Sequence, residues 1–189
     1  MVIQYNLIAV VSENMGLAKD GTLPFKLPRE YEFYMRITKE TTDKSKKNIM
    51  IMGRTSWDCL QEDEKPFPGR INFILTSRKD LDVSDKPDTY VFNSWADIEL
   101  KLEDPEFKKT YETIWIAGGN KLYDYAQKSK YFYRTYISRV RKFAVCDTFY
   151  PELVTNVRLV HDDRVPQGVQ RENGLEWQVE VWENTHISK

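Results

Sequence analysis

Short apolar runs alternate with helix-like segments along most of the chain. Apolar residues occupy both alternating positions of the runs 49–52, 71–76 and 113–117, which is typical of strands covered on two faces. In the run 175–183 apolar and polar residues alternate instead, which predicts a half-exposed antiparallel edge hairpin with residues 156–162. The remaining strands are expected at residues 3–11, 89–92 and 131–140.

Helices fit between these strands. Pro28 suits the first position of a helix that continues to residue 38, and Ser94 with Asp97 resembles a capping box before another helix. Two more helices are expected to begin near Arg54 and Gly119. The order of elements predicts a single α/β domain over residues 1–189, with a mainly parallel sheet of about eight strands, an antiparallel C-terminal edge hairpin and about four helices on its faces. Solvated loops are expected at the charged stretches 39–47, 61–68 and 167–174.

Composition narrows the class of protein. Of 189 residues, 41% are hydrophobic and 30% are charged, and 28 Lys and Arg nearly balance 29 Asp and Glu. A chain without a net positive field gives no reason to expect nucleic acid or a membrane surface as a partner. Two cysteines are too few for a disulfide framework or a four-ligand zinc site, so we expect no metal and a reducing, cytoplasmic location. We expect a monomer.

Three strand ends carry residues suited to phosphate. Gly53, Arg54, Thr55 and Ser56 follow the run 49–52, Gly118 and Gly119 follow the run 113–117, and Ser77 and Arg78 follow the run 71–76. In open α/β sheets ligands bind outside the carboxyl ends of strands, where glycine allows close approach and helix starts offer free N–H groups. At any single end, a glycine at a βα turn is more often ordinary turn chemistry than a phosphate site.

Taken together, the three ends predict a dinucleotide site. Arg54 and Arg78 are suited to a ribose 2′-phosphate, and these ends carry no acidic residue, so NADP is favoured over NAD. The chain has neither the G-x-G-x-x-G fingerprint nor a Walker motif. The expected site is therefore neither a standard Rossmann site nor a P-loop.

Glu30 is the candidate acid. Helical spacing places it with Phe33, Tyr34 and Ile37 on the apolar face, whereas Glu32 points towards Arg36 as in a solvent-facing pair. A carboxylate on an apolar face near a cleft can bind an amidine-like group or take part in proton transfer. The residues alone leave a second explanation open, in which Glu30 only stabilises the positive end of the helix that begins at Pro28.

Six motifs occur in order along the chain and carry a family resemblance. They are IAVVSENMG (8–16), LPFKLPRE (23–30), MGRTSW (52–57), PGRIN (68–72), WIAGG (115–119) with Tyr123, and DTFYP (147–151). Over nearly its whole length the chain resembles dihydrofolate reductase, in a form with eukaryote-like loop insertions. The resemblance implies reduction of 7,8-dihydrofolate to tetrahydrofolate with NADPH, by hydride transfer to pterin C6 and protonation at N5.

The resemblance also assigns roles to residues. Glu30 matches the carboxylate that binds the pterin and promotes its protonation, Thr148 matches the threonine that hydrogen-bonds this acid, and Leu23 and Phe25 match nearby residues of the reacting region. Arg70 matches the arginine that holds the glutamate carboxylate of the substrate. The other substrate-binding positions are Ile8, Ala9, Tyr31, Tyr34, Leu60, Phe67 and Ala117. The cofactor positions are Val10, Leu17, Gly53, Arg54, Thr55, Ser56, Ser77, Arg78, Gly118, Gly119 (joined by a cis peptide), Asn120, Lys121, Leu122 and Tyr123.

Some positions depart from the family pattern. Phe25 stands where the family nearly always has Trp, so this position keeps an apolar wall but donates no hydrogen bond. Leu17 and Ala18 replace the usual Ile-Gly of the loop over the nicotinamide. We expect antifolates to bind. Two alternatives stay open: a riboflavin-pathway pyrimidine reductase on the same fold, and a noncatalytic nucleotide- or RNA-binding module.

Overall fold

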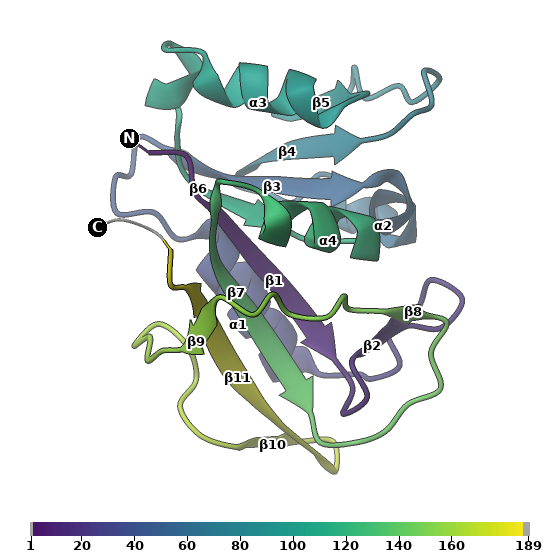
Figure 1. The fold of residues 1–189 in the computed structure, drawn as a ribbon. Coiled ribbons are helices and arrows are strands. Elements are labelled where there is room, and N and C mark those ends of the chain that lie inside the picture. Colours follow the sequence, from purple (N-terminus) through teal and green to yellow (C-terminus); the bar gives the residue numbers. More distant parts are fainter. Residues whose placement is uncertain (1, 187–189) are drawn as a thin grey trace.

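One twisted sheet runs through the computed structural model, which describes residues 2–186 (Figure 1). Its order is β10-β11-β7-β1-β6-β3-β4-β5, and β9 also pairs with β11. The strands of this sheet are β1 (Tyr5–Val11), β3 (Lys47–Gly53), β4 (Arg70–Leu75), β5 (Thr89–Phe92), β6 (Tyr111–Ile116), β7 (Phe132–Val140), β9 (Val157–Leu159), β10 (Gln170–Glu172) and β11 (Leu175–Asn184).

The centre of the sheet is parallel, as the sequence predicts. The strands β7, β1, β6, β3, β4 and β5 pair in parallel, and β11 pairs antiparallel with β7. Along β3, Ile49 and Ile51 enter one buried cluster, whereas Met50 and Met52 enter the other. Because both faces of these strands are covered, both alternating positions must be apolar.

The C-terminal edge differs from the prediction in one element. The expected antiparallel pairing of the run 156–162 with β11 is confirmed, although it joins only residues 157–159 to 182–184. The stretch 167–174 is not simply a solvated loop, because β10 forms a tight hairpin with β11 through Asn173 and Gly174. Both turn residues have positive φ, of 51° and 72°, as a two-residue hairpin turn requires.

Helices cover both faces of the sheet. The four α-helices of the described residues are α1 (Pro28–Lys39), α2 (Arg54–Cys59), α3 (Trp95–Glu103) and α4 (Asn120–Lys128). Buried side chains of α3 and α4 join one core cluster, and those of α1 and α2 join the other. Figure 1 accordingly shows α4 in front of the sheet and α1 behind it. The predicted cap of α3 is confirmed, since the Asp97 N–H donates to Ser94 Oγ at 3.1 Å.

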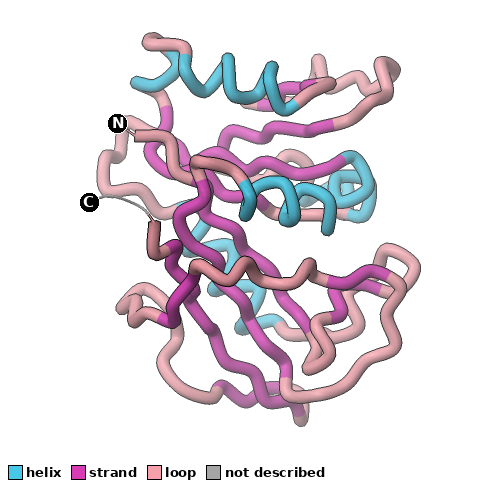
Figure 2. The backbone as a smooth tube through the Cα atoms, in the orientation of Figure 1, coloured by secondary structure: helices cyan, strands magenta, loops and turns pink. Residues whose placement is uncertain are grey.

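Loops and a small second sheet complete the fold. The strands β2 (Gly16–Ala18) and β8 (Thr148–Phe149), which the apolar pattern does not predict, pair with each other. The chain after β7 is mostly loop (Figure 2), and the expected loop at 61–68 contains a 3₁₀ turn at Glu62–Glu64. A second 3₁₀ turn spans Phe107–Lys109. No helix in residues 2–186 has the length and apolar content needed to cross a membrane.

Candidate active site

A cavity of about 560 Å³ opens where the carboxyl ends of β3 and β6 meet the starts of α2 and α4. Its walls come from segments that are distant in the sequence, as expected for an open α/β sheet. Most of the predicted site residues line it. The lining residues are Leu17, Ala18, Gly21, Leu23, Tyr34, Met52, Gly53, Arg54, Thr55, Ser56, Cys59, Leu60, Phe67, Ala117, Gly118, Gly119, Asn120, Lys121, Leu122, Tyr123 and Thr148.

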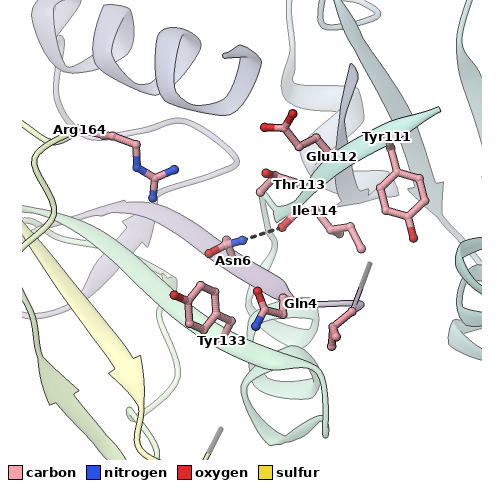
Figure 3. Close-up of a pocket in the computed structure, with 9 residues that line it drawn as sticks. Gln4, Asn6, Tyr111, Glu112, Thr113, Ile114, Tyr133 and Arg164 are labelled. Atoms are coloured by element: carbon pink, nitrogen blue, oxygen red, sulfur yellow. Dashed lines mark hydrogen bonds between the residues drawn. The ribbon is translucent and has the colours of Figure 1, made fainter. Parts of the chain in front are cut away.

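A smaller hollow of about 160 Å³ lies at the amino ends of β1 and β6 (Figure 3). Its polar groups are largely engaged with other protein groups. Arg164 pairs with Asp162, and Asn6 donates a long hydrogen bond of 3.5 Å to the Ile114 carbonyl. The larger cavity, which residues of two predicted strand ends line, is therefore the candidate active site.

Glu30 is buried beside the larger cavity. Its side chain is 3% exposed, and Ser138 Oγ of β7 donates to Glu30 Oε1 at 2.6 Å. Loss of hydration raises the pKa of Glu30 to about 7, although the Ser138 hydrogen bond acts in the opposite direction. Glu30 does not itself line the cavity, but Tyr34, one helical turn further along α1, does. An acid that changes protonation near neutral pH therefore lies next to the cavity wall.

The prediction that Thr148 hydrogen-bonds Glu30 is wrong. The Thr148 hydroxyl donates to Asp147 Oδ1 at 3.2 Å, and Ser138 supplies the hydroxyl that contacts Glu30. The cause is topological: Thr148 belongs to β8 of the small sheet, whereas Ser138 lies on β7 of the central sheet, beside Val10 of β1. Thr148 instead contributes to the cavity wall near Leu17.

Behind the aromatic wall that Tyr34 and Phe67 give the cavity lies a buried cation. Tyr31 stacks on Tyr34 with ring centroids 6.2 Å apart, and the Arg70 guanidinium lies 5.4 Å from the Phe67 centroid. Arg70 is 1% exposed and forms no ion pair within residues 2–186. It donates to Thr38 Oγ1 at 3.1 Å and to the carbonyls of residues 68 and 35. Arg70 Nη2 also donates to Met35 Sδ at 3.6 Å. Of the five guanidinium N–H donors, one on Nη1 therefore has no protein acceptor, and one on Nη2 has only this weak sulfur acceptor.

The glycine pair joins two strand ends. As expected, the bond between Gly118 and Gly119 is cis, and the Gly118 carbonyl accepts from the Gly53 N–H at 2.8 Å. Gly118 has a φ of 107°, and a side chain there would meet Tyr123 Oη at 3.2 Å. No side chain caps the start of α4 at Gly119. The Leu122 N–H donates to the Gly119 carbonyl at 2.9 Å, so the N–H groups of Asn120 and Lys121, which line the cavity, are the donors suited to an anion.

The two predicted phosphate-binding arginines lie at neighbouring strand ends but already have acidic partners. Arg54 Nε donates to Asp58 at 2.9 Å, and Arg78 forms two hydrogen bonds to Asp80. The Arg78 hydrogen bond lowers the pKa of Asp80, so this carboxyl is firmly ionised. The expectation that acidic residues are absent here is therefore wrong. Arg54 Nη1 is nevertheless buried without a hydrogen-bond partner, and Asp80 Oδ1 is 3.9 Å from it.

Other predicted residues lie around the cavity rather than in its wall. Ile8 lies on the face of β1 that packs with α1, and its carbonyl accepts from Tyr123 Oη at 2.7 Å. Ala9 packs on the opposite face, and Val10 and Phe25 each pack against the buried cluster of Leu27, Val140 and Trp177. Ser77 is exposed in the turn before Arg78.

Several residues of the site have no counterpart in the sequence prediction. Cys59 and Met52 line the cavity. The position of Ser138 in its strand is a signal that could have identified it. Ser138 is two residues after Tyr136 on β7, so both side chains point to the same face of the sheet, the face that α1 covers. A hydroxyl on the buried face of a strand needs a partner, and Glu30 provides one.

Comparison with known proteins decides the family. The family model described as dihydrofolate reductase matches residues 4–183. The chain belongs to the dihydrofolate reductase family. The dihydrofolate reductase of Aedes albopictus is 34% identical over 95% of this chain and 97% of its own length, and that of Drosophila melanogaster is 33% identical over 96% and 98%.

The dihydrofolate reductase fold is shown independently by a solved structure. Schistosoma mansoni dihydrofolate reductase superposes with a TM-score of 0.84 at 29% identity, covering 97% of this chain and 100% of that one. The single α/β domain with a mainly parallel sheet, predicted from the sequence, is thereby confirmed. The pyrimidine-reductase alternative is not favoured, since family model and relatives agree on one family.

Proposed function

We propose that this protein reduces 7,8-dihydrofolate to tetrahydrofolate with NADPH. The observation that carries the proposal is Glu30, a buried carboxyl with a pKa raised to about 7 next to a cavity that Arg54 and Lys121 line, with the buried Arg70 behind its aromatic wall. Family membership alone indicates an oxidoreductase with a pyridine-nucleotide cofactor. The residues around the cavity support the assignment of each end.

Arg70 marks the substrate end. The aromatic rings of Tyr31, Tyr34 and Phe67 suit a flat heterocycle and its attached ring, and Leu60 extends the same apolar wall. Beyond them Arg70 is buried with no carboxylate of its own in the described chain. A ligand carboxylate, such as that of the glutamate tail of dihydrofolate, would satisfy this cation bidentately.

Glu30 serves the proton step. The ionised carboxylate accepts hydrogen bonds from the amidine-like edge of the pterin. The protonated form can pass its proton to N5 by way of an intervening water. A pKa near 7 makes both forms available at neutral pH. The Ser138 hydrogen bond at 2.6 Å fixes one carboxyl oxygen, so the other is the oxygen available to the pterin.

The opposite end of the cavity fits the cofactor. NADPH, when bound, supplies the hydride for pterin C6. The uncapped first turn of α4 and the residues Thr55 and Ser56 would hold its pyrophosphate, and Leu17 and Tyr123 would pack near the nicotinamide. Arg54 Nη1, which has no hydrogen-bond partner and lies 3.9 Å from Asp80 Oδ1, fits a phosphate on the adenosine ribose. That atom is the structural reason to prefer NADPH to NADH.

Absorbance-monitored NADPH consumption by the purified protein tests the function. Consumption should depend on added dihydrofolate, and NADH in a parallel reaction should support a slower rate. Glu30→Gln should lower kcat steeply while NADPH still binds, whereas Glu32→Gln on the exposed face of α1 should leave kcat unchanged. No dihydrofolate-dependent consumption would reject the function, and an unchanged kcat in Glu30→Gln would remove Glu30 from it.

We also propose a setting for this activity. The two free thiols, Cys59 and Cys146, suit the reducing cytoplasm, and a monomer suffices because one chain supplies both ends of the cavity. The aromatic wall and Arg70 would bind antifolates that share the heterocycle and carboxylate of the substrate. Analytical ultracentrifugation and inhibitor titration test these two points.

A further inference from the structure

The start of α1 has no cap of its own. Pro28 occupies the first turn, and Leu27 at the N-cap position offers no side-chain hydrogen bond. The backbone N–H groups of the first turn of a helix have no partner within the helix, and buried ones need an acceptor from elsewhere. In α1 the N–H groups that need such an acceptor are those of Arg29 and Glu30.

Glu172 of β10 supplies that acceptor from another part of the chain. Its Oε2 accepts from the Arg29 N–H at 2.9 Å, and its Oε1 accepts from the Glu30 N–H at 3.1 Å. The Trp177 indole N–H donates to the same Oε1 at 2.8 Å, which fixes the carboxylate from the β11 side. One carboxylate therefore accepts three hydrogen bonds, two of them from α1.

The hairpin that carries Glu172 is itself tied to this helix start. Asn173 Nδ2 in the turn donates to the Lys26 carbonyl at 2.9 Å, just before α1. Arg29 Nη1 donates to the Arg171 carbonyl at 3.3 Å. The β10–β11 hairpin thus contacts the chain on both sides of Pro28, and Glu172 is the charged group at the centre of these contacts.

We propose that Glu172 is a positioning residue for the reaction: it anchors the first turn of α1 and places a negative charge at the backbone of Glu30. The part of this inference that concerns catalysis rests on the proposed function. The anchoring and the charge effect on Glu30 do not depend on it.

The surroundings of Glu30 give the direction of the effect. Loss of hydration raises its pKa most, the Ser138 hydroxyl from β7 lowers it, and the negative charge of Glu172 from β10 raises it. Tyr34, on the same helix, stays neutral because burial raises its own pKa. A helix start carries partial positive charge that would favour an ionised Glu30, and Glu172 offsets that charge. Removing the charge of Glu172 should therefore lower the pKa of Glu30.

Glu172→Gln tests the inference through a direct titration. The pKa of Glu30 is measured from its side-chain ¹³C signal in uniformly labelled, ligand-free protein, with Glu30→Gln used to assign the signal. We expect Glu172→Gln to lower this pKa by about one unit, the size of effect that a neighbouring like charge produces. Glu176→Gln, at a half-buried carboxylate on the same hairpin that pairs with Arg171, is the matched control and should leave the pKa unchanged.

Glu172→Asp is a second test, which can be used if Glu172→Gln folds poorly. Glu172→Asp keeps the charge but withdraws the carboxylate from α1, so the pKa of Glu30 should fall by less than in Glu172→Gln. Amide hydrogen exchange at residues 29 and 30 should become faster in both variants, because both weaken the anchoring hydrogen bonds. An unchanged pKa in the variants that fold, or unchanged exchange at both amides, would overturn the inference.

Kinetics separate positioning from a purely structural role. In Glu172→Gln, kcat/KM for dihydrofolate should match the wild type at acidic pH and fall up to about tenfold at alkaline pH, since a pKa one unit lower leaves tenfold less protonated Glu30. An equal loss at every pH would contradict the charge effect. If the protein does not reduce dihydrofolate but the Glu30 signal shifts as expected, the proposed function fails and the positioning inference stands.

Discussion

Glu30→Gln should stabilise the fold at alkaline pH while removing activity. Burial raises the pKa of Glu30 from 4.5 to about 7, so the folded state binds this proton more tightly than the unfolded state. Below about pH 4.5 both states are protonated and the group costs nothing. Stability then falls as pH rises towards 7, and above that pH the full cost remains.

The size of this cost follows from the shift. Each pKa unit corresponds to about 1.4 kcal/mol, so the shift to about 7 amounts to about 3 kcal/mol of lost stability. Gln has a similar shape and no charge, so it does not incur this cost. Relative to wild type, Glu30→Gln should therefore gain about 3 kcal/mol of unfolding free energy between about pH 4.5 and pH 8.

Urea unfolding at acidic and alkaline pH measures this difference. The relevant quantity is the change in free energy of unfolding between the two pH values, compared between variant and wild type. Glu32→Gln on the exposed face of the same helix controls for loss of a carboxylate in general. If the difference between Glu30→Gln and wild type is the same at both pH values, Glu30 is not the buried, proton-retaining group described here.

Three further predictions concern the ends of the cavity. Asp80→Asn removes a carboxylate that competes with phosphate for Arg54 and Arg78. Calorimetry should therefore show several-fold tighter binding of adenosine 2′,5′-bisphosphate and little change for 5′-AMP. Equal effects on both ligands would refute the competition. Arg70→Lys loses bidentate geometry, so KM for dihydrofolate should rise roughly 30-fold, as expected for about 2 kcal/mol, whereas a pteridine without the glutamate tail should be unaffected. Cys59 is exposed and lines the cavity, so an antifolate should slow its alkylation; an unprotected thiol would place the ligand elsewhere.

The sheet could be predicted because its burial leaves a strong pattern in the sequence. The residues of β3 alternate between two cores, which forces a continuous apolar run. The strand β10 has no such pattern, because Gln170, Arg171 and Glu172 form an edge and are polar. The Asn173-Gly174 pair that follows is a hairpin signal, and it was the available evidence for this strand.

The cavity residues were easier to predict than their partners. Glycines and arginines at strand ends are local features, and the cavity opens at two of the three predicted ends, those at Gly53 and at Gly118. The partner of Glu30 is 108 residues away, and its identity depends on how α1 crosses β7. The family resemblance assigns the hydrogen bond to Glu30 to Thr148, which lies in the motif DTFYP (147–151). Ser138 lies in a strand that carries no such motif. The pairing of Asp80 with Arg78 is not predictable for a similar reason, because it depends on how the turn after β4 folds back.

The pH dependence of single-turnover dihydrofolate reduction, measured with saturating NADPH, tests the central claim most directly. The rate should be constant at acidic pH and decline about tenfold per pH unit above pH 7, as the buried carboxyl next to the cavity loses its proton. In Glu30→Gln the rate should be low and should not show this transition. A wild-type rate that stays constant well above pH 7, or a variant that keeps the transition, would contradict the account.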